Sequence, residues 1–260
     1  MNRSHTISVQ SEARIALACL DLTSLNDRDS EADVALLCER ARGRYGDVAA
    51  VCVWPRFAAF ARAQLPESIA VAAVANFPDG SADVQRALRD TDMIVDAGAQ
   101  EVDVVLPYRA LMAGDTASCS TLLDAVRRAC DGLLLKVILE TGVLEDPAAI
   151  RSAARLALAA GADFLKTSTG KTPVSATLPA ASVMLQAIVA DPSAHARVGF
   201  KAAGGVRSVT EAARYIELTA SILGEAALVP ARFRIGASGL LTDIEAVLGG
   251  AVPSGPPGNY

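Results

Sequence analysis

The sequence predicts an α/β protein, a single-domain (β/α)8 TIM barrel, and three observations favour that fold. The chain has 260 residues, and α/β barrels of one domain commonly reach about 250 residues. Short apolar runs alternate with longer helical stretches along the chain, which is typical of repeated βα units. Several of these runs are continuously apolar, as strands are when both of their faces are buried.

Eight apolar runs are predicted as strands. They cover residues 15–21, 48–54, 68–77, 100–107, 133–141, 163–169, 198–205 and 232–238. Matched positions recur at intervals of 33, 30, 35 and 35 residues from Asp103 through Lys136, Lys166 and Lys201 to Gly236, and a βα unit needs roughly 30 residues or more. A doubly wound open sheet is the alternative, but no GxGxxG motif follows the first predicted strand, which counts against it.

Two of the intervening segments carry clear helix signals. Asp146 and Pro147 stand in the first turn of one segment, and Gly161 ends it, as expected of a helix with an N-terminal proline and a C-terminal glycine. Ser208 and Glu211 open the other, SVTEAARYIELTASIL, with the spacing of a capping box. Both segments are therefore predicted as helices between strands.

No internal linker interrupts this pattern. Residues 1–251 are predicted to form the barrel, and residues 252–260 (VPSGPPGNY) a flexible C-terminal tail. The first residues lack the long apolar core of a signal peptide, and no run of 18 apolar residues follows. We expect a cytoplasmic protein that does not span a membrane.

The composition excludes several classes of protein. Hydrophobic residues make up 52% of the chain and the mean hydropathy is +0.32, so the chain is not intrinsically disordered. The net charge of −5, without a basic block, argues against binding to nucleic acid or to a membrane surface. Five scattered cysteines without a CxxC pair and only two histidines argue against a disulfide framework and a zinc site. We expect no metal and no cofactor.

Charged residues stand inside or at the end of the otherwise apolar predicted strands: Asp21, Asp103, Lys136, Lys166 and Lys201. A lone buried ammonium is costly, and barrel enzymes carry their active sites at the carboxyl ends of the strands. Structural ion pairs, such as one between Lys136 and Asp103, are the alternative. Three lysines on consecutive strands with only one strongly placed carboxylate nearby favour catalysis, with Asp21 and Lys136 in supporting roles.

The chemistry that suits paired lysines is Schiff-base formation. A free lysine has a pKa of about 10.4, and desolvation or a neighbouring cation lowers it, which frees the amine to attack a carbonyl. Lys166 and Lys201 on adjacent strands can supply the nucleophile and that cation; electrostatics alone leaves open which is which. The position of Lys166 just before the loop TSTGK favours it as the nucleophile, and Asp103 would carry protons.

Glycine-rich segments follow the last three predicted strands. Their candidate phosphate-binding residues are Gly170, Lys171, Gly204, Gly205, Arg207, Gly236, Ser238 and Gly239. Loops after the last strands of a barrel often bind phosphate through backbone N–H groups. Tight turns alone would explain one such loop, whereas three in succession favour a phosphorylated substrate.

These motifs resemble the deoxyribose-phosphate aldolase family of class I aldolases. The matching segments are LDLTSLND (20–27), EVDVVLPYRALMAGD (101–115), LKVILETG (135–142), GADFLKTSTGK (161–171), VGFKAAGGVR (198–207) and GAS (236–238). The resemblance implies a metal-independent barrel enzyme in which Lys166 forms the Schiff base. It also implies that Lys201 is the second lysine, a proton donor or acceptor that tunes Lys166, and that Asp103 is a proton donor and acceptor.

The implied reaction is the reversible cleavage of 2-deoxy-D-ribose 5-phosphate to D-glyceraldehyde 3-phosphate and acetaldehyde, in deoxyribonucleoside breakdown. Family members often end a tail in a tyrosine that relays protons, which makes Tyr260 a candidate; an inert tail is the alternative. Members often carry a second serine where this chain has Gly239, a departure that bears on phosphate affinity. The expected partners are small phosphosugars and aldehydes, with a homodimer as the candidate assembly.

Two other functions are compatible with these residues. One is a different Schiff-base enzyme on the same barrel, acting on another phosphosugar or on a keto acid. The other is a sugar-phosphate sensor without activity, against which the presence of Lys166, Lys201 and Asp103 argues.

Overall fold

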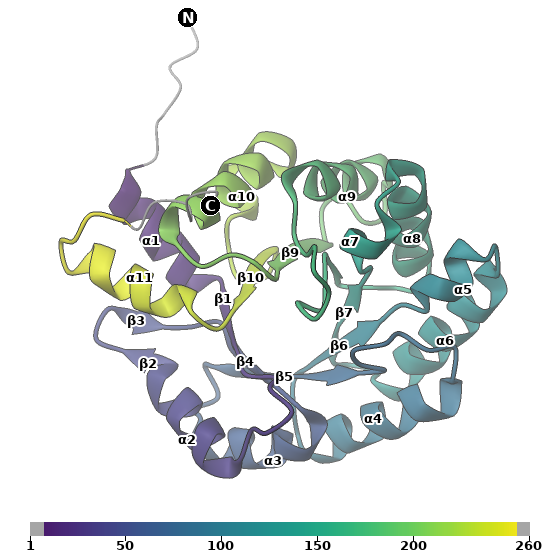
Figure 1. Cartoon of the computed structure of the whole chain (residues 1–260), viewed down its shortest axis with the longest axis horizontal. Helices are drawn as coiled ribbons and strands as arrows, with labels where there is room; N and C mark the ends of the chain where they lie inside the picture. Colours follow the sequence, from purple (N-terminus) through teal and green to yellow (C-terminus); the bar gives the residue numbers. More distant parts are fainter. Residues whose placement is uncertain (1–7, 254–260) are drawn as a thin grey trace, which may run out of the picture.

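The computed structural model describes residues 8–253, and eight parallel strands close into a barrel there (Figure 1). The strands are β1 (Leu20–Thr23), β4 (Ala50–Val53), β5 (Ala70–Ala75), β6 (Glu101–Val105), β7 (Leu134–Ile138), β8 (Phe164–Lys166), β9 (Gly199–Ala203) and β10 (Phe233–Ala237). Neighbours in sequence are neighbours in the barrel, and β1 pairs with both β10 and β4 to close it. The predicted (β/α)8 TIM barrel is confirmed.

The helices surround this barrel (Figure 1). They are α1 (Val9–Ala18), α2 (Glu31–Arg40), α3 (Pro55–Gln64), α4 (Val84–Asp96), α5 (Tyr108–Met112), α6 (Thr116–Ala129), α7 (Thr141–Leu144), α8 (Pro147–Ala159), α9 (Leu178–Ala190), α10 (Val209–Leu223) and α11 (Leu240–Leu248), with a short 3-10 helix at Glu225–Ala227. Both predicted helix starts are confirmed. Asp146 caps α8, and Ser208 with Glu211 forms a complete capping box on α10.

The first predicted strand, residues 15–21, is partly wrong, because residues 15–18 belong to the last turns of α1. The side chain of Ser8 caps this helix, and its buried residues Ala13, Ala16 and Leu17 have helical spacing. Helix α1 packs against α10 and α11. A run of apolar residues continues from the end of this helix into β1, so hydrophobic periodicity alone does not separate the two elements.

Besides the barrel, the structure contains a small antiparallel pair that the sequence analysis did not predict. Strand β2 (Arg42–Gly43) pairs with β3 (Gly46–Asp47), and the two lie between α2 and β4 in the chain. A pair this short leaves almost no periodic signal in the sequence. It does not contribute to the barrel.

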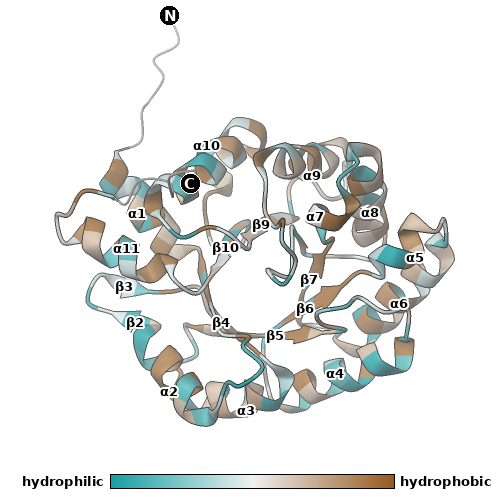
Figure 2. Cartoon of the chain, in the orientation of Figure 1, coloured by the Kyte–Doolittle hydropathy of each residue, from teal (hydrophilic) through white to brown (hydrophobic). Residues whose placement is uncertain are grey.

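The core is mainly aliphatic, consistent with an aromatic content of only 4%. Figure 2 shows hydrophobic residues along the barrel strands and hydrophilic residues spread over the outer helices. The exception is the barrel interior, where a set of charged side chains is almost fully buried: Asp21, Glu101, Asp103, Lys136, Lys166, Lys201 and Arg234.

Residues 1–7 and 254–260 lie outside the described part, so the predicted role of Tyr260 and most of the predicted tail remain predictions. Within residues 8–253, no helix has both the length and the apolar character needed to cross a membrane.

Candidate active site

The register of the parallel strands brings the predicted lysines and Asp103 to one place inside the barrel. Asp103 on β6 is paired in register with Lys136 on β7, and Lys166 at the end of β8 is paired with Lys201 on β9. Each of these side chains points inward, because their charged ends are buried and meet around Asp103. Four charged residues distant in sequence therefore meet in the barrel interior.

One carboxylate joins all three lysines. The Nζ atoms of Lys166 and Lys201 each lie 2.8 Å from Oδ2 of Asp103. The Nζ atom of Lys136 donates to the other oxygen, Oδ1, at 2.7 Å. The ion pair anticipated between Lys136 and Asp103 is therefore present, and it coexists with the pair of lysines on the other oxygen.

The surroundings push the pKa values of the two lysines in opposite directions. Burial lowers the pKa of Lys166 below its ordinary value; Asp103 opposes this shift and the neighbouring Lys201 adds to it. Burial acts on Lys201 in the same sense, but the carboxylates of Asp103 and Asp21 outweigh it and raise its pKa. Lys201 is thus held as an ammonium, while Lys166 is the amine that loses its proton most readily.

Asp103 is held in its ionised form. Burial alone would raise the pKa of this carboxyl group, but the charges of Lys136, Lys166 and Lys201 outweigh burial and hold the pKa well below its usual range. A carboxylate in this state accepts hydrogen bonds. It can orient the Lys166 amine.

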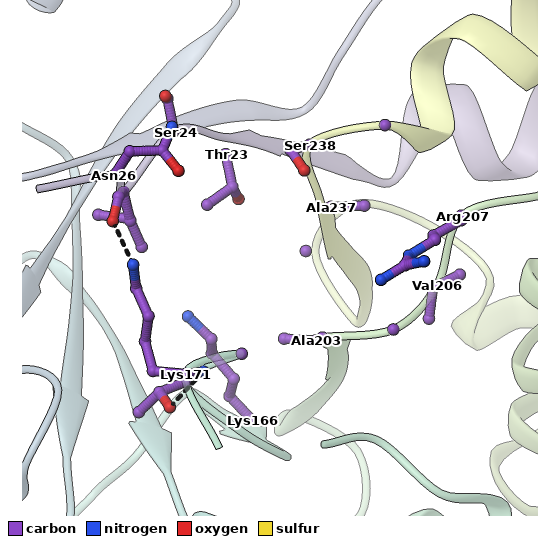
Figure 3. A pocket seen from close by; sticks show the side chains of 17 residues that line it. Thr23, Ser24, Asn26, Lys166, Lys171, Ala203, Val206, Arg207, Ala237 and Ser238 are labelled. Carbon is purple, nitrogen blue, oxygen red and sulfur yellow. Dashed lines mark hydrogen bonds between the residues drawn. The ribbon is translucent and has the colours of Figure 1, made fainter. Parts of the chain in front are cut away.

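A pocket of about 280 Å³ opens above this cluster at the carboxyl ends of the strands. Lys166 points into it, and the close-up in Figure 3 shows its amine facing the centre. All eight residues predicted to bind phosphate line the same pocket: Gly170, Lys171, Gly204, Gly205, Arg207, Gly236, Ser238 and Gly239. The structure thus joins the lysine cluster and the glycine-rich loops in one cavity.

Comparison with known proteins fits this geometry. The model of the DeoC/LacD family of aldolases matches residues 15–242. The chain belongs to this family. It is 46% identical over 251 residues to the deoxyribose-phosphate aldolase of Agrobacterium fabrum, which covers 95% of this chain and 96% of the relative.

Solved structures of the family have the same fold. The apo form of a candidate deoxyribose-phosphate aldolase from Toxoplasma gondii ME49 superposes with a TM-score of 0.85 at 27% identity, covering 94% of this chain and 98% of the other. A candidate enzyme of the same kind from Coccidioides immitis gives a TM-score of 0.79 at 26% identity, covering 93% and 92%.

We expected only one carboxylate, that of Asp103, close to the three lysines. For this DeoC/LacD family member that expectation is wrong. Asp21 accepts a hydrogen bond from Lys201, and Glu101 accepts one from Lys136. The guanidinium of Arg234 contacts both Asp21 and Glu101. Glu101 and Arg234 were missed because each lies near the start of its strand, where charged residues are usually solvent-exposed. The i, i+2 spacing of Glu101 and Asp103 was the available signal, because it places both on the inner face.

The end of β1 and the loop after it form one wall of the pocket in this family member, and the sequence analysis did not assign them to the site. Their lining residues are Thr23, Ser24, Leu25 and Asn26. Lys171 donates to the backbone carbonyl of Leu25 at 2.7 Å, and Trp54 donates from Nε1 to the carbonyl of Asn26 at 3.1 Å. Trp54 therefore supports this wall from behind.

Glu140 is a further residue that the sequence analysis missed. It is fully buried with a left-handed backbone (φ 58°), just after β7. Its carboxylate accepts hydrogen bonds from the hydroxyl and the backbone N–H of Thr169. It thereby fixes the start of the loop that carries Gly170 and Lys171 to the pocket.

The described residues also include cysteine thiols, scattered acidic side chains and one histidine. All five cysteines are buried and free. Cys52 lies behind Asp103, with its sulfur 4.0 Å from Oδ2. No group of three or more His, Cys, Asp or Glu side chains in the range 8–253 is arranged to hold a metal ion. His195, one of the two histidines, is exposed.

Proposed function

We propose that this protein is a class I deoxyribose-phosphate aldolase. It cleaves 2-deoxy-D-ribose 5-phosphate reversibly to D-glyceraldehyde 3-phosphate and acetaldehyde through a lysine Schiff base, in deoxyribonucleoside breakdown. The observation that carries this proposal is the placement of Lys166, which alone among the buried charged residues of the described barrel also lines the pocket. A nucleophile at a pocket wall, activated from below, suits Schiff-base chemistry.

The phosphate of the substrate is proposed to bind at the glycine-rich rim. Gly204 and Gly205 have φ values of 86°, a conformation that glycine adopts without strain. Gly239 is the N-cap of α11, so backbone N–H groups of that helix start lie at the pocket together with Ser238. Arg207 and Lys171 add positive charge at the rim.

The reaction begins when the neutral amine of Lys166 attacks C1 of the open-chain sugar. Loss of water gives an iminium ion at C1, which accepts the electron pair when the C2–C3 bond breaks. A base removes the proton of the C3 hydroxyl, and D-glyceraldehyde 3-phosphate leaves. The enamine on Lys166 then takes a proton at C2, and hydrolysis of the resulting iminium releases acetaldehyde and the free lysine.

Asp103 and Lys201 are proposed to move the protons of these steps. The carboxylate of Asp103 is positioned to accept a proton, directly or through a water molecule. Because its pKa is held well below the usual range, the donating steps depend on the ammonium of Lys201 or on water. Asp21 and Lys136 support this arrangement from below.

The proposal is tested by a comparison of aldol donors. Purified protein is incubated with D-glyceraldehyde 3-phosphate and acetaldehyde, pyruvate or dihydroxyacetone, and the products are identified by mass spectrometry. We expect product only with acetaldehyde. Product with pyruvate or dihydroxyacetone instead would assign the protein to another Schiff-base aldolase, and binding without turnover would indicate a sensor.

We propose a cytoplasmic enzyme of small phosphosugars and aldehydes, with residues 1–251 as the barrel and residues 252–260 as a flexible tail. The proposed assembly is a homodimer, and light scattering coupled to gel filtration distinguishes it from other states. The aldolase from Aeropyrum pernix, described as a tetramer, shares 24% identity with this chain, which bears on fold alone.

A further inference from the structure

The buried charges below the pocket form a closed ring. Arg234 contacts Asp21 and Glu101, Lys136 contacts Glu101 and Asp103, and Lys201 contacts Asp103 and Asp21, which closes the ring. Three carboxylates thus alternate with three cations, and each member touches two members of opposite charge. A cross contact of 3.6 Å between Lys136 and Asp21 spans the middle.

Lys166 lies outside this ring. Among residues 8–253 its amine has one ionic contact, with Asp103, whose two oxygens already accept from Lys136 and Lys201. The ring members carry three negative and three positive charges, so the ring is electrically balanced before Lys166 is counted. A proton on Lys166 would leave one uncompensated charge in a buried site, which is unfavourable.

We propose that the ring acts as one charge-balanced unit that keeps the Lys166 amine uncharged, and that Glu101 and Arg234 are positioning residues for the reaction. This inference rests on the proposed function of Lys166. Neither residue lines the pocket, and both are nearly fully buried. Their effect on Lys166 passes through the shared partners Asp21, Lys136 and Asp103.

Other charged or titratable groups near Lys166 are neutral or have hydrogen-bond partners of their own. Burial raises the pKa of the Cys52 thiol on β4, so it is neutral at physiological pH. Lys171, in the loop after β8, donates to the carbonyl of Leu25. Glu140, after β7, accepts from Thr169. The fixed charges that face the amine from β1, β6, β7, β9 and β10 are the ring members themselves.

The charge balance of the ring predicts that two single substitutions shift the pH at which Lys166 loses its proton in opposite directions. Arg234→Met leaves the ring with one excess negative charge, so Lys166 holds its proton to higher pH. Glu101→Gln leaves one excess positive charge, so Lys166 loses its proton at lower pH. The double variant restores neutrality, and Arg234→Lys preserves it. A purely structural role would not produce opposite shifts that cancel.

The test measures the rate at which cyanoborohydride and acetaldehyde modify Lys166 as a function of pH, with peptide mapping by mass spectrometry. We expect the midpoint to rise by about one pH unit in Arg234→Met and to fall by a similar amount in Glu101→Gln. The double variant and Arg234→Lys should keep the wild-type midpoint. Arg86→Met, which removes a cation from a partly exposed pair with Asp79, is the matched control.

The outcomes separate the two proposals. Absence of modification of Lys166 in the wild-type protein would overturn the proposed function itself. Modification with the same midpoint in all variants, or shifts of the same sign in both single variants, would overturn the ring proposal and leave the function standing. Should a single variant fail to fold, as judged by circular dichroism, a shifted midpoint in the double variant or in Arg234→Lys would overturn it equally.

Discussion

Lys166 and Lys201 share one acceptor atom but differ in their second partner. Both amines lie 2.8 Å from Oδ2 of Asp103. Lys201 also contacts the carboxylate of Asp21, whereas Lys166 faces the pocket. Asp103 and Asp21 together hold Lys201 as a cation, whereas burial and then the Lys201 cation lower the pKa of Lys166. The electrostatic argument from sequence left the order of the two lysines open, and this asymmetry favours Lys166 as the nucleophile.

The first prediction follows from that asymmetry. Lys201→Leu removes the adjacent cation, so the pKa of Lys166 rises. Because the neutral amine is the reactive form, the rising limb of the pH–rate profile moves to higher pH. Activity at neutral pH should fall by about two orders of magnitude, measured by release of acetaldehyde from 2-deoxy-D-ribose 5-phosphate.

The control for this variant is Arg155→Leu, which removes an exposed cation from α8 and should leave the profile unchanged. A Lys201→Leu enzyme with the wild-type profile and a near-normal rate would mean that Lys201 is only structural.

The second prediction concerns the position where family members often carry serine. An added Cβ at Gly239 would have no atom within 4 Å, and its backbone is in a conformation open to any residue. Gly239→Ser therefore adds a hydroxyl at the pocket rim without a clash. We expect KM for the phosphorylated substrate to fall by about tenfold, the effect of one hydrogen bond to a charged group.

Gly239→Ala adds the carbon without the hydroxyl and should not lower KM. Unphosphorylated 2-deoxyribose serves as the second control, and an equal gain for both sugars would show that the hydroxyl does not act on the phosphate.

The third prediction is that activity survives removal of metal ions. In the proposed reaction the electron pair is accepted by the iminium on Lys166, and the chain has only two histidines with which to build a zinc site. Activity should be unchanged after dialysis against EDTA. Activity that is lost and then returns with added Zn²⁺ would indicate a metal-dependent aldolase.

The fourth prediction concerns Tyr260, which lies outside the described residues. The nine residues from 252 to 260 span about 30 Å when extended, enough to reach over a barrel mouth. A phenol there could protonate C2 of the enamine, so Tyr260→Phe should slow deuterium exchange into acetaldehyde while modification of Lys166 continues. Tyr45→Phe, in the turn between β2 and β3, is the control; an unchanged exchange rate in Tyr260→Phe would show that the tail has no part in this step.

The sequence was sufficient for the barrel and for most of the pocket, because both leave local signals. Strands buried on both faces are recognisable as apolar runs, and a lysine inside such a run is conspicuous. The error at residues 15–18 arose where the apolar end of a half-exposed helix and a buried strand adjoin without a polar break. There, only tertiary packing determines the boundary.

The ring partners were harder to predict because their signal is not local. Glu101 and Arg234 are ordinary charged residues at strand starts, and only the register between β6 and its neighbours brings Glu101 to Lys136. Glu140 depends on a left-handed turn that glutamate rarely adopts, so propensity argues against it. These contacts require the three-dimensional structure.

The central claim, that Lys166 forms the Schiff base, is tested most directly by trapping. The protein is incubated with acetaldehyde and borohydride, digested, and its lysine-containing peptides are mapped by mass spectrometry. All lysines of the chain, at positions 136, 166, 171 and 201, lie in or beside the site, so the map discriminates among the candidates that matter. We predict an ethyl group on Lys166, and a label found mainly on Lys136, Lys171 or Lys201 would contradict the account.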